Sequence, residues 1–540
     1  MKKLVSRFMA VLMAMTMILS MSMTAFAADA SKGTLTVNNT VAGKTLDLYQ
    51  IFTATKSENN VAYTLNSAYE GFFQSKITDA STLTGEALSE KAYAYVKEQV
   101  GETGSNGAAF AKDILGWILS ASGETKTAVE STHSTATTAD TKTVIDNLAY
   151  GYYVVYPLGA TDTSTAPGNE TVKSVASLVS VTGTDATVNM KSNYPTVVKK
   201  VNDKIADDVN IGDTVTYTLT SKVPDMTGYT SYVFNFKDTL AKGLTFGSIT
   251  SVTVGSGENV QNVTAGTGDN TYTLTKDEQN ITITMNNFLA SNANKAGQEI
   301  KVTYTATLNK DAVTGFDPNT NKATVEYSNK PGTDEKGESE PSKVDVHTFD
   351  FTIFKYYLKD ATQTGLANAE FELYKANAAG DAADTNAKIN IVKVKDGVYR
   401  QATPEEAAAE GFKSDVIVSG TDGKVLVKGL DAGTYYLRET KAPEGYNKLF
   451  SDIKVEIKAT YGTDGKLASY RVDYTYTGNT TTGSEITNKT DSPEVAVENK
   501  TGAQLPSTGS KGALMVTLAG IVLFGALTAS KAFGKKKANN

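Results

Sequence analysis

Most of this chain consists of short segments in which apolar and polar residues alternate, and this pattern restricts the fold more than any other feature. Clear examples are Val215 to Thr220, Ile281 to Met285 and Ile300 to Leu308. A period of two turns one face of a strand toward the core and the other toward solvent. Many short strands at this spacing predict antiparallel sandwiches. The predicted fold class is therefore mainly β, with Ig-like β-sandwich domains in tandem.

The composition narrows the function. The chain has 540 residues, no cysteine, only two histidines and a formal charge of -7. So few histidines argue against a Ser/His/Asp hydrolase and a histidine-rich metal site, and an acidic chain has little affinity for nucleic acid. Asp203, Asp207, Asp208 and Asp213 lack the EF-hand spacing and are interpreted as a solvated loop. We expect no turnover enzyme, no cofactor, no metal and no nucleic-acid partner.

A chain of this length accommodates three or four domains. Polar connectors at Lys191 to Pro195 and Gly332 to Ser342 indicate where they divide. The first region also has a helical apolar pattern from Ala87 to Leu119, which Gly101 to Gly107 divides into two helices. The predicted organisation is a signal peptide at 1–27, an N-terminal domain with added helices at 28–192, β-sandwich domains at 193–345 and 346–500, and a C-terminal segment at 501–540.

The N-terminus has the features of an export signal. Basic residues precede an apolar run from Phe8 to Met23, and Ala25-Phe26-Ala27 follows. This small-x-small pattern predicts cleavage between Ala27 and Ala28. The mature protein is therefore expected outside the cell.

The C-terminus combines three features in order. The pentapeptide of Leu505, Pro506, Ser507, Thr508 and Gly509 precedes an apolar run from Gly512 to Phe533 and a lysine cluster. About 20 apolar residues can cross a bilayer as a helix, and terminal lysines stay in the cytoplasm. The trio resembles the cell-wall sorting signal of Gram-positive surface proteins, which implies a transient membrane stage and sortase cleavage between Thr508 and Gly509. An ordinary membrane anchor with a chance pentapeptide is the alternative.

Other motifs carry a more specific resemblance. The sequence G-T-Y-Y-L-R-E-T-K-A-P-E-G-Y at 433–446 resembles the E-box of Cna-B-type (SpaA-like) pilin domains, and F-D-F-T-I-F-K at 349–355 resembles the first strand of such a domain. The second region resembles an isopeptide-forming fimbrial domain through P-T-V-V-K, F-N-F-K-D-T-L and N-K-A-T-V-E-Y. Over nearly its whole length the chain resembles a sortase-assembled major pilin, the shaft subunit of a Gram-positive pilus.

That resemblance implies internal Lys–Asn isopeptide bonds. Such a bond needs a neutral lysine, which burial favours by lowering the lysine pKa. It also needs an asparagine amide and a protonated carboxylic acid nearby, and folding supplies the proximity. The reaction is autocatalytic and happens once per domain.

The resemblance assigns the residues as follows. In the third domain Lys355 is the nucleophile, Glu439 the acid, and Asn499 or its rival Asn488 the acceptor. In the second domain the set is Lys199, with Lys200 as competitor, Asp238 and Asn321. Alternation along a strand turns one of the two adjacent lysines inward and the other to solvent.

Polymerisation requires a separate, exposed lysine. Relatives carry it in a V-x-x-P-K motif, whereas this chain has Val188-Asn189-Met190-Lys191. Lys191 is the predicted acceptor for Thr508, and Lys200 is the alternative. The implied partners are a class C (pilus) sortase, a housekeeping sortase, identical subunits in a head-to-tail polymer, minor pilins and peptidoglycan, with a host receptor as a further candidate. A singly wall-anchored adhesin that binds a host protein or glycan is the alternative function.

Overall fold

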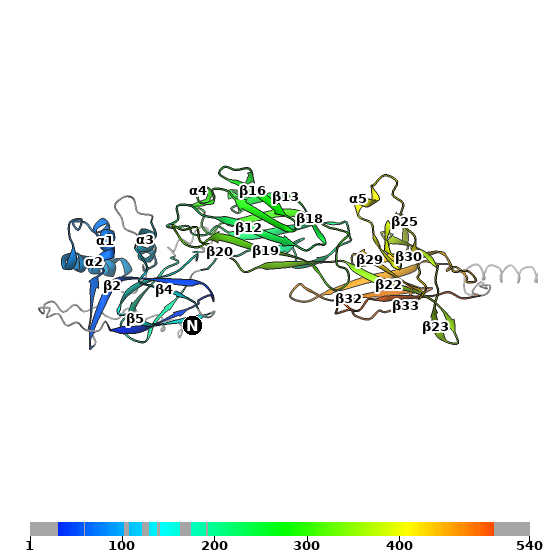
Figure 1. The fold of residues 1–540 in the computed structure, drawn as a ribbon, viewed down its shortest axis with the longest axis horizontal. Coiled ribbons are helices and arrows are strands. Elements are labelled where there is room, and N and C mark those ends of the chain that lie inside the picture. Colours follow the sequence, from blue (N-terminus) through cyan, green and yellow to red (C-terminus); the bar gives the residue numbers. More distant parts are fainter. Residues whose placement is uncertain are drawn as a thin grey trace, which may run out of the picture.

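The computed structural model describes residues 31–501 except 59, 102–106, 121–128, 138–140, 162–173 and 191–192. The described chain forms an elongated row of three units that follow one another in sequence order (Figure 1). Among the described residues no helix is long and apolar enough to cross a membrane. The predicted signal peptide, the sorting pentapeptide and the predicted span from Gly512 to Phe533 lie outside them.

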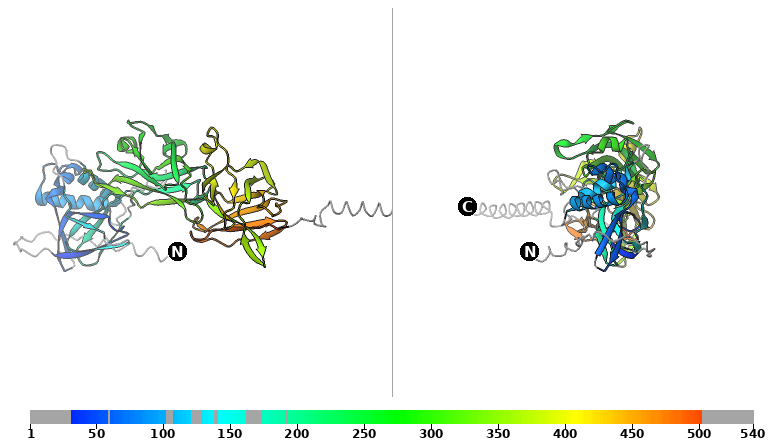
Figure 2. Two further views of the ribbon diagram at one scale, coloured as in Figure 1. Left: turned by 45° about the vertical axis from the view of Figure 1, so that its right-hand side comes forward. Right: turned by 90° about the vertical axis from the view of Figure 1, so that its left-hand side faces the viewer.

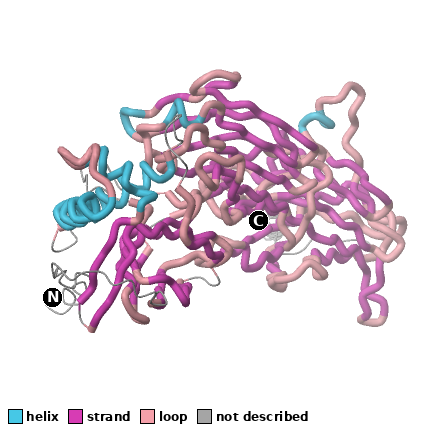
Figure 3. Tube along the Cα trace, turned by 60° about the vertical axis from the view of Figure 1, so that its left-hand side comes forward, coloured by secondary structure: helices cyan, strands magenta, loops and turns pink. Residues whose placement is uncertain are grey.

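The first unit contains the long helices, which gather at one end of the molecule (Figure 3). Its elements are β1 Lys32–Asn38, β2 Thr45–Ser57, β3 Asn60–Leu65, η1 Ser67–Tyr69, α1 Glu70–Lys76, α2 Gly85–Val100, α3 Gly107–Leu119, β4 His133–Ala136, β5 Lys142–Ala149, β6 Gly151–Pro157, β7 Ser177–Val181 and β8 Ala186–Asn189. One sheet has the order β5-β1-β8, and the other has the order β3-β2-β6-β7 with β4 beside β2. The helical prediction for 87–119 is confirmed by α2 and α3, and α1 is an addition.

The second unit is a sandwich of two sheets. Its elements are β9 Val198–Val201, β10 Ala206–Asp208, β11 Thr214–Lys222, β12 Phe234–Leu240, β13 Leu244–Val254, η2 Gly257–Asn259, β14 Gln261–Asn262, β15 Thr264–Ala265, β16 Thr271–Asp277, β17 Asn280–Met285, α4 Phe288–Asn292, β18 Glu299–Leu308, β19 Asn319–Ser328, β20 Lys336–Glu338 and β21 Ser342–His347. The sheet β14-β13-β18-β11-β9 faces the sheet β10-β21-β19-β12-β17-β16-β15. Apolar side chains of both sheets form one buried core, as alternation predicts.

The third unit is a second sandwich. Its elements are β22 Phe349–Lys359, β23 Thr362–Gly365, β24 Glu370–Ala376, β25 Ala383–Lys388, β26 Ile391–Lys395, β27 Val398–Gln401, α5 Pro404–Ala407, β28 Ile417–Val418, β29 Lys424–Leu430, β30 Gly433–Lys441, β31 Ile453–Tyr461, β32 Leu467–Tyr476, β33 Asn479–Thr481 and β34 Glu494–Glu498. The first strand, β22, pairs in parallel with the last, β34. The prediction of a mainly β fold with several sandwich sheets is confirmed.

The second and third units lie next to each other (Figure 2), and polar contacts join them. Asp208 accepts hydrogen bonds from the Tyr461 hydroxyl at 2.6 Å and from the Ala432 backbone N–H at 2.7 Å. Asp213 is also half-buried and caps the turn at Asn210. The interpretation of this aspartate group as a solvated loop is therefore wrong for Asp208, which ends β10, and for Asp213, because the third domain covers this segment.

The first and second units are also in contact. Lys112 of α3 forms an ion pair with Asp225 at 3.4 Å, and the Asp225 N–H donates to the Thr161 hydroxyl. The Lys44 ammonium donates to the Tyr327 hydroxyl at 3.0 Å. Both joints thus contain side chains from the two domains that they connect.

Candidate functional site: two buried lysine–carboxylate–asparagine clusters

The short strand β9 carries the two adjacent lysines of the second domain and turns them in opposite directions. Lys199 has no exposed side-chain area, whereas Lys200 is exposed. Because β9 pairs with β11 at the edge of a sandwich sheet, alternation turns Lys199 into the core and Lys200 to solvent. The structure therefore buries Lys199 in the core of the sandwich and leaves Lys200 on the surface.

Lys199 lies in a fully buried polar cluster. Its ammonium contacts Asp238 Oδ2 and donates to the Tyr304 hydroxyl at 2.7 Å. The Tyr304 hydroxyl donates to Asp238 Oδ2 at 2.8 Å, and Asn321 Nδ2 donates to the same hydroxyl oxygen at 2.8 Å. The structure thus brings together all three predicted residues, with Tyr304 in the middle.

Two sheets supply this cluster. Lys199 and Tyr304 belong to β9 and β18 of one sheet, and Asp238 and Asn321 belong to β12 and β19 of the other. The register that pairs Leu240 with Asn321 sets β12, which carries Asp238, beside β19, which carries Asn321. The four polar side chains therefore meet in the middle of the sandwich, where water is excluded.

Burial dominates the electrostatics of the second-domain cluster. It lowers the pKa of Lys199, against the opposing attraction of Asp238, and it raises the pKa of Tyr304 well above its ordinary value. The Lys199 nitrogen lies 4.8 Å from the ring centre of Tyr217 and 5.1 Å from that of Tyr304. A lysine in this setting is driven toward the neutral, nucleophilic form.

The third domain contains a similar set. Lys355 on β22 has no exposed side-chain area, and its ammonium lies 3.1 Å from Glu439 Oε1. Asn499 is 1% exposed and donates through Nδ2 to Glu439 Oε2 at 3.3 Å and to the Asn447 carbonyl. The Leu449 N–H donates to Glu439 Oε2 at 2.7 Å. Here the carboxylate itself connects the lysine to the amide.

Strand pairing explains how Asn499 reaches the cluster. The parallel pairing of β22 and β34 sets Lys355 opposite Val497, and the Asn499 N–H donates to the Tyr356 carbonyl at 2.9 Å. Asn488, in contrast, is exposed and bonds to Asp491. The structure therefore brings Asn499 to Lys355 and Glu439 and leaves Asn488 on the surface.

The pKa of Lys355 lies well below that of an ordinary lysine. Burial lowers the pKa of Lys355 to about 8, with Glu439 acting in the opposite direction. The nearby aromatic group is Phe371, whose ring centre is 5.9 Å from the lysine nitrogen. At pH 7 about a tenth of an amine with this pKa is in the neutral, nucleophilic form, which is far more than for an ordinary lysine.

Some polar atoms of both clusters stay without hydrogen bonds. Among the described residues, Asn321 Oδ1 and Asn499 Oδ1 have no hydrogen-bond partner, and neither have Asp238 Oδ1 and Glu439 Oε1. Buried polar atoms rarely lack a hydrogen-bond partner. Both clusters contain such atoms, which makes these two sites chemically unusual. The described part of the chain contains no group of His, Cys, Asp or Glu suited to a metal ion.

Sequence reasoning missed Tyr304 and the backbone groups of Asn447 and Leu449. Tyr304 occupies an inward position in an ordinary alternating strand, so its pattern is that of a core residue. Only its position opposite Lys199, a consequence of sandwich closure, reveals the polar role.

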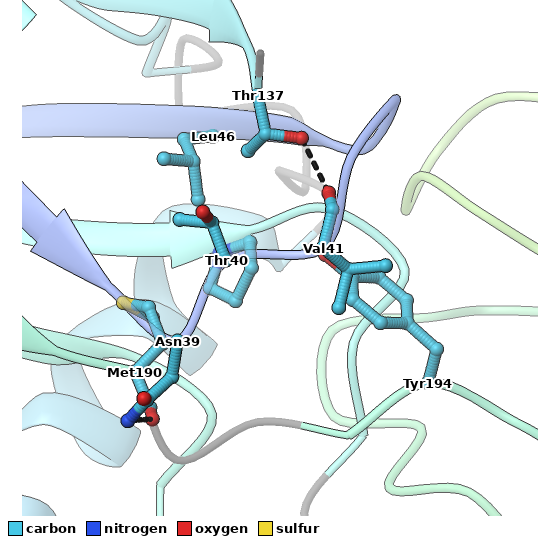
Figure 4. Close-up of a pocket in the computed structure, with 8 residues that line it drawn as sticks. Asn39, Thr40, Val41, Leu46, Thr137, Met190 and Tyr194 are labelled. Carbon is cyan, nitrogen blue, oxygen red and sulfur yellow. Dashed lines mark hydrogen bonds between the residues drawn. The ribbon is translucent and has the colours of Figure 1, made fainter. Parts of the chain in front are cut away.

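Lys191, the predicted acceptor, lies outside the described residues. The residues on either side of the omitted pair are held in place, because Asn39 donates to the Met190 carbonyl at 3.2 Å and Asn193 pairs with Thr161. Met190 and Tyr194 line a cavity of about 10 Å³ together with Asn39, Thr40, Val41, Leu46, Thr137 and Pro157 (Figure 4). A cavity of this size holds at most one water molecule and is no ligand site.

Comparison with known families identifies the class of these domains. Residues 211–331 match the family described as Gram-positive pilin backbone subunit 2, Cna-B-like domain, and residues 353–467 match SpaA, a prealbumin-like fold domain. The second unit is therefore similar to a pilin backbone domain, and the third unit is similar to a SpaA-type domain. The resemblance to Gram-positive pilins is confirmed for these two domains, and neither family is one of enzymes.

Several similar proteins come from streptococci. The trypsin-resistant surface T6 protein of Streptococcus pyogenes is 26% identical over 282 residues, which cover 48% of this chain and 44% of that protein; the match thus spans less than half of the relative. The solved T6 backbone pilin of serotype M6 S. pyogenes has 16% identity and a TM-score of 0.45, covering 88% of this chain and all of that one. The group B streptococcus pilus 2b backbone protein has 26% identity and a TM-score of 0.39, covering 57% and 99%.

Proposed function

We propose that the protein is the structural backbone subunit of a covalent pilus on a Gram-positive cell surface. The observation that carries this proposal is the repetition of one buried lysine–carboxylate–asparagine cluster in two consecutive domains that match pilin families. Burying a lysine and a carboxylate together disfavours folding, because the attraction between the paired charges seldom exceeds the free energy lost when both are removed from water. Conversion of each cluster into a neutral amide removes that cost.

Each cluster is proposed to form an isopeptide bond. The lysine Nζ attacks the asparagine Cγ, a C–N bond forms, the Cγ–Nδ2 bond breaks, and ammonia leaves. The acceptors are Asn321 for Lys199 and Asn499 for Lys355, with Asp238 and Glu439 as the promoting acids. Folding holds the reacting groups together, so the proximity that an enzyme would supply is already present.

The bonds would brace the strands through which tension passes. In the third domain the bond would link the first strand, β22, to the end of the last strand, β34, directly before the chain leaves for the sorting pentapeptide. In the second domain it would link β9 of one sheet to β19 of the other. Covalent links at these places slow unfolding, which is the kinetic stability that a pulled fibre needs.

Polymerisation is proposed to join the C-terminal sorting pentapeptide of one subunit to a lysine between the first two domains of the next. A pilus sortase would form a thioester on Thr508, and Lys191 of the next subunit would resolve it, with Lys200 as the alternative. Repetition gives a head-to-tail fibre with heterologous contacts. A housekeeping sortase would transfer the fibre to peptidoglycan, and minor pilins and a host receptor would complete its partners.

The test uses the full-length chain made without any sortase. Peptide mass spectra should show two cross-linked pairs, Lys199 with Asn321 and Lys355 with Asn499, each lighter by one ammonia than its uncrosslinked sum. Addition of a pilus sortase should then produce a covalent ladder that Lys191→Arg abolishes. Internal bonds without a ladder would favour the singly anchored adhesin, and the absence of both bonds would overturn the proposed isopeptide chemistry.

A further inference from the structure

The second-domain cluster differs from the third-domain cluster in one respect. In the third domain Glu439 contacts both the lysine and Asn499 Nδ2. In the second domain no hydrogen bond among the described residues joins Asp238 to Asn321, and the Tyr304 hydroxyl lies between them, with bonds of 2.8 Å on either side. Glu439 can therefore pass a proton directly to the leaving nitrogen of Asn499. Asp238 has no such direct contact with Asn321, and a proton would have to pass through the Tyr304 hydroxyl.

Tyr304 is held firmly in this place. Its side chain is fully buried, and its ring stacks on Tyr217 with centroids 5.2 Å apart and an interplanar angle of 24°. Phe246 packs against it at 5.6 Å. The hydroxyl also accepts from the Lys199 ammonium at 2.7 Å. One rigid phenol thus touches the nucleophile, the acid and the leaving nitrogen.

We propose that Tyr304 is a catalytic residue of the second domain, which carries a proton from Asp238 to the leaving nitrogen of Asn321. This inference rests on the proposed isopeptide chemistry and assigns to that site a fourth residue that the third domain does not use. Tyrosine is an established general acid–base side chain. The planar amide nitrogen of Asn321 donates to Tyr304 at first, and it becomes able to accept only after attack makes it pyramidal.

The proton balance is as follows. Lys199 first passes one proton to Asp238, and its neutral Nζ forms the C–N bond with Asn321 Cγ. Tyr304 then gives its own proton to the leaving nitrogen and takes from Asp238 the proton that the carboxylate had received. The attacking nitrogen gives its second proton to Asp238, whose carboxylate is free to accept it again. The Cγ–Nδ2 bond breaks and ammonia departs. The lysine nitrogen has lost two protons, of which one is in ammonia and one remains on Asp238.

The two domains permit an internal control in a single molecule. The full chain and its Tyr304→Phe variant would be made by cell-free translation, samples would be quenched in denaturant at intervals, and both cross-linked peptides would be quantified by mass spectrometry. Phenylalanine keeps the ring that packs on Tyr217 but removes the hydroxyl. We expect the Lys199–Asn321 bond to form about 10²-fold more slowly and the Lys355–Asn499 bond to form at the wild-type rate.

Two further measurements keep the outcome unambiguous. Tyr327→Phe removes another buried hydroxyl from the same domain and should leave both rates unchanged, and the thermal transition of Tyr304→Phe reports whether the second domain still folds. Equal rates of second-domain bond formation in wild type and Tyr304→Phe would overturn the role of Tyr304 alone. Absence of the second-domain bond from wild type would instead overturn the proposed chemistry of that domain, and this inference with it.

Discussion

Tyr461 of the third domain donates a 2.6 Å hydrogen bond to Asp208 of the second domain. The other oxygen of the same carboxylate accepts from the Ala432 N–H, and the Ile211 N–H donates to the Gly429 carbonyl at 3.0 Å. Gly429 has a φ of +90°, and a Cβ there would lie 2.6 Å from the Ile211 side chain. Glycine is thus required where the two domains meet closely.

Removal of the Tyr461 hydroxyl should loosen this joint. Tyr461→Phe deprives Asp208 of a hydrogen bond to a charged group, which is worth about 1.5–3 kcal/mol. A thermal double-mutant cycle with Asp208→Asn should show coupling of that order, and small-angle X-ray scattering should show a broader distribution of domain orientations. Tyr436→Phe is the matched control, because its hydroxyl bonds to Gly380 within the third domain. Coupling near zero would contradict a role of this pair in the joint.

The two asparagine candidates of the third domain can be separated by substitution. Asn499→Ala should abolish the Lys355 cross-link and lower the unfolding free energy of the third domain by about 2–5 kcal/mol, as loss of a disulfide over a long loop does. Asn488→Ala should keep the cross-link, because Asn488 is exposed and bonds only to near neighbours in sequence. Peptide mass spectra and calorimetry measure both effects. A cross-link that survives Asn499→Ala would assign the acceptor elsewhere.

An uncrosslinked third domain should gain stability as the pH rises above 8. Burial lowers the pKa of Lys355 to about 8 in the folded state, against an ordinary value of 10.5. Between these values the unfolded chain binds a proton that the folded chain does not, so the free energy of unfolding rises with pH by about 3 kcal/mol in total. Below pH 8 both states hold the proton and this contribution is constant.

Asn499→Ala is the background for this measurement, because it keeps Lys355 as a free amine. Denaturant titrations from pH 7 to pH 10.5 would be compared with those of the same variant carrying Lys355→Met as well. The difference between the two curves isolates Lys355 from the other groups that titrate at alkaline pH. Parallel curves would mean that burial does not shift this lysine.

Local patterns predicted the strands and the members of the two buried clusters better than the contacts between domains. Alternation through Val198 to Val201 indicates that adjacent lysines face opposite ways, but only the pairing of β9 with β11 shows that Lys199 is the inner one. The group around Asp208 has the composition of a solvated loop, and its burial depends on a second domain more than 200 residues later. The role of Tyr304 was equally hard to predict, because its polar neighbours are set by how the two sheets pack against each other.

Replacement of the two adjacent lysines should separate the internal reaction from polymerisation. Lys199→Met should abolish the second-domain cross-link and destabilise the domain by about 2–5 kcal/mol, as loss of a native disulfide does, and it leaves Asp238 buried without its lysine partner. Addition of Asp238→Asn should recover part of that loss. Lys200→Ala should change stability by no more than about 0.5 kcal/mol and keep the cross-link, since its side chain faces solvent. Calorimetry and a sortase ladder assay complete the test: a ladder lost only in Lys200→Ala would make Lys200, in place of Lys191, the acceptor between subunits.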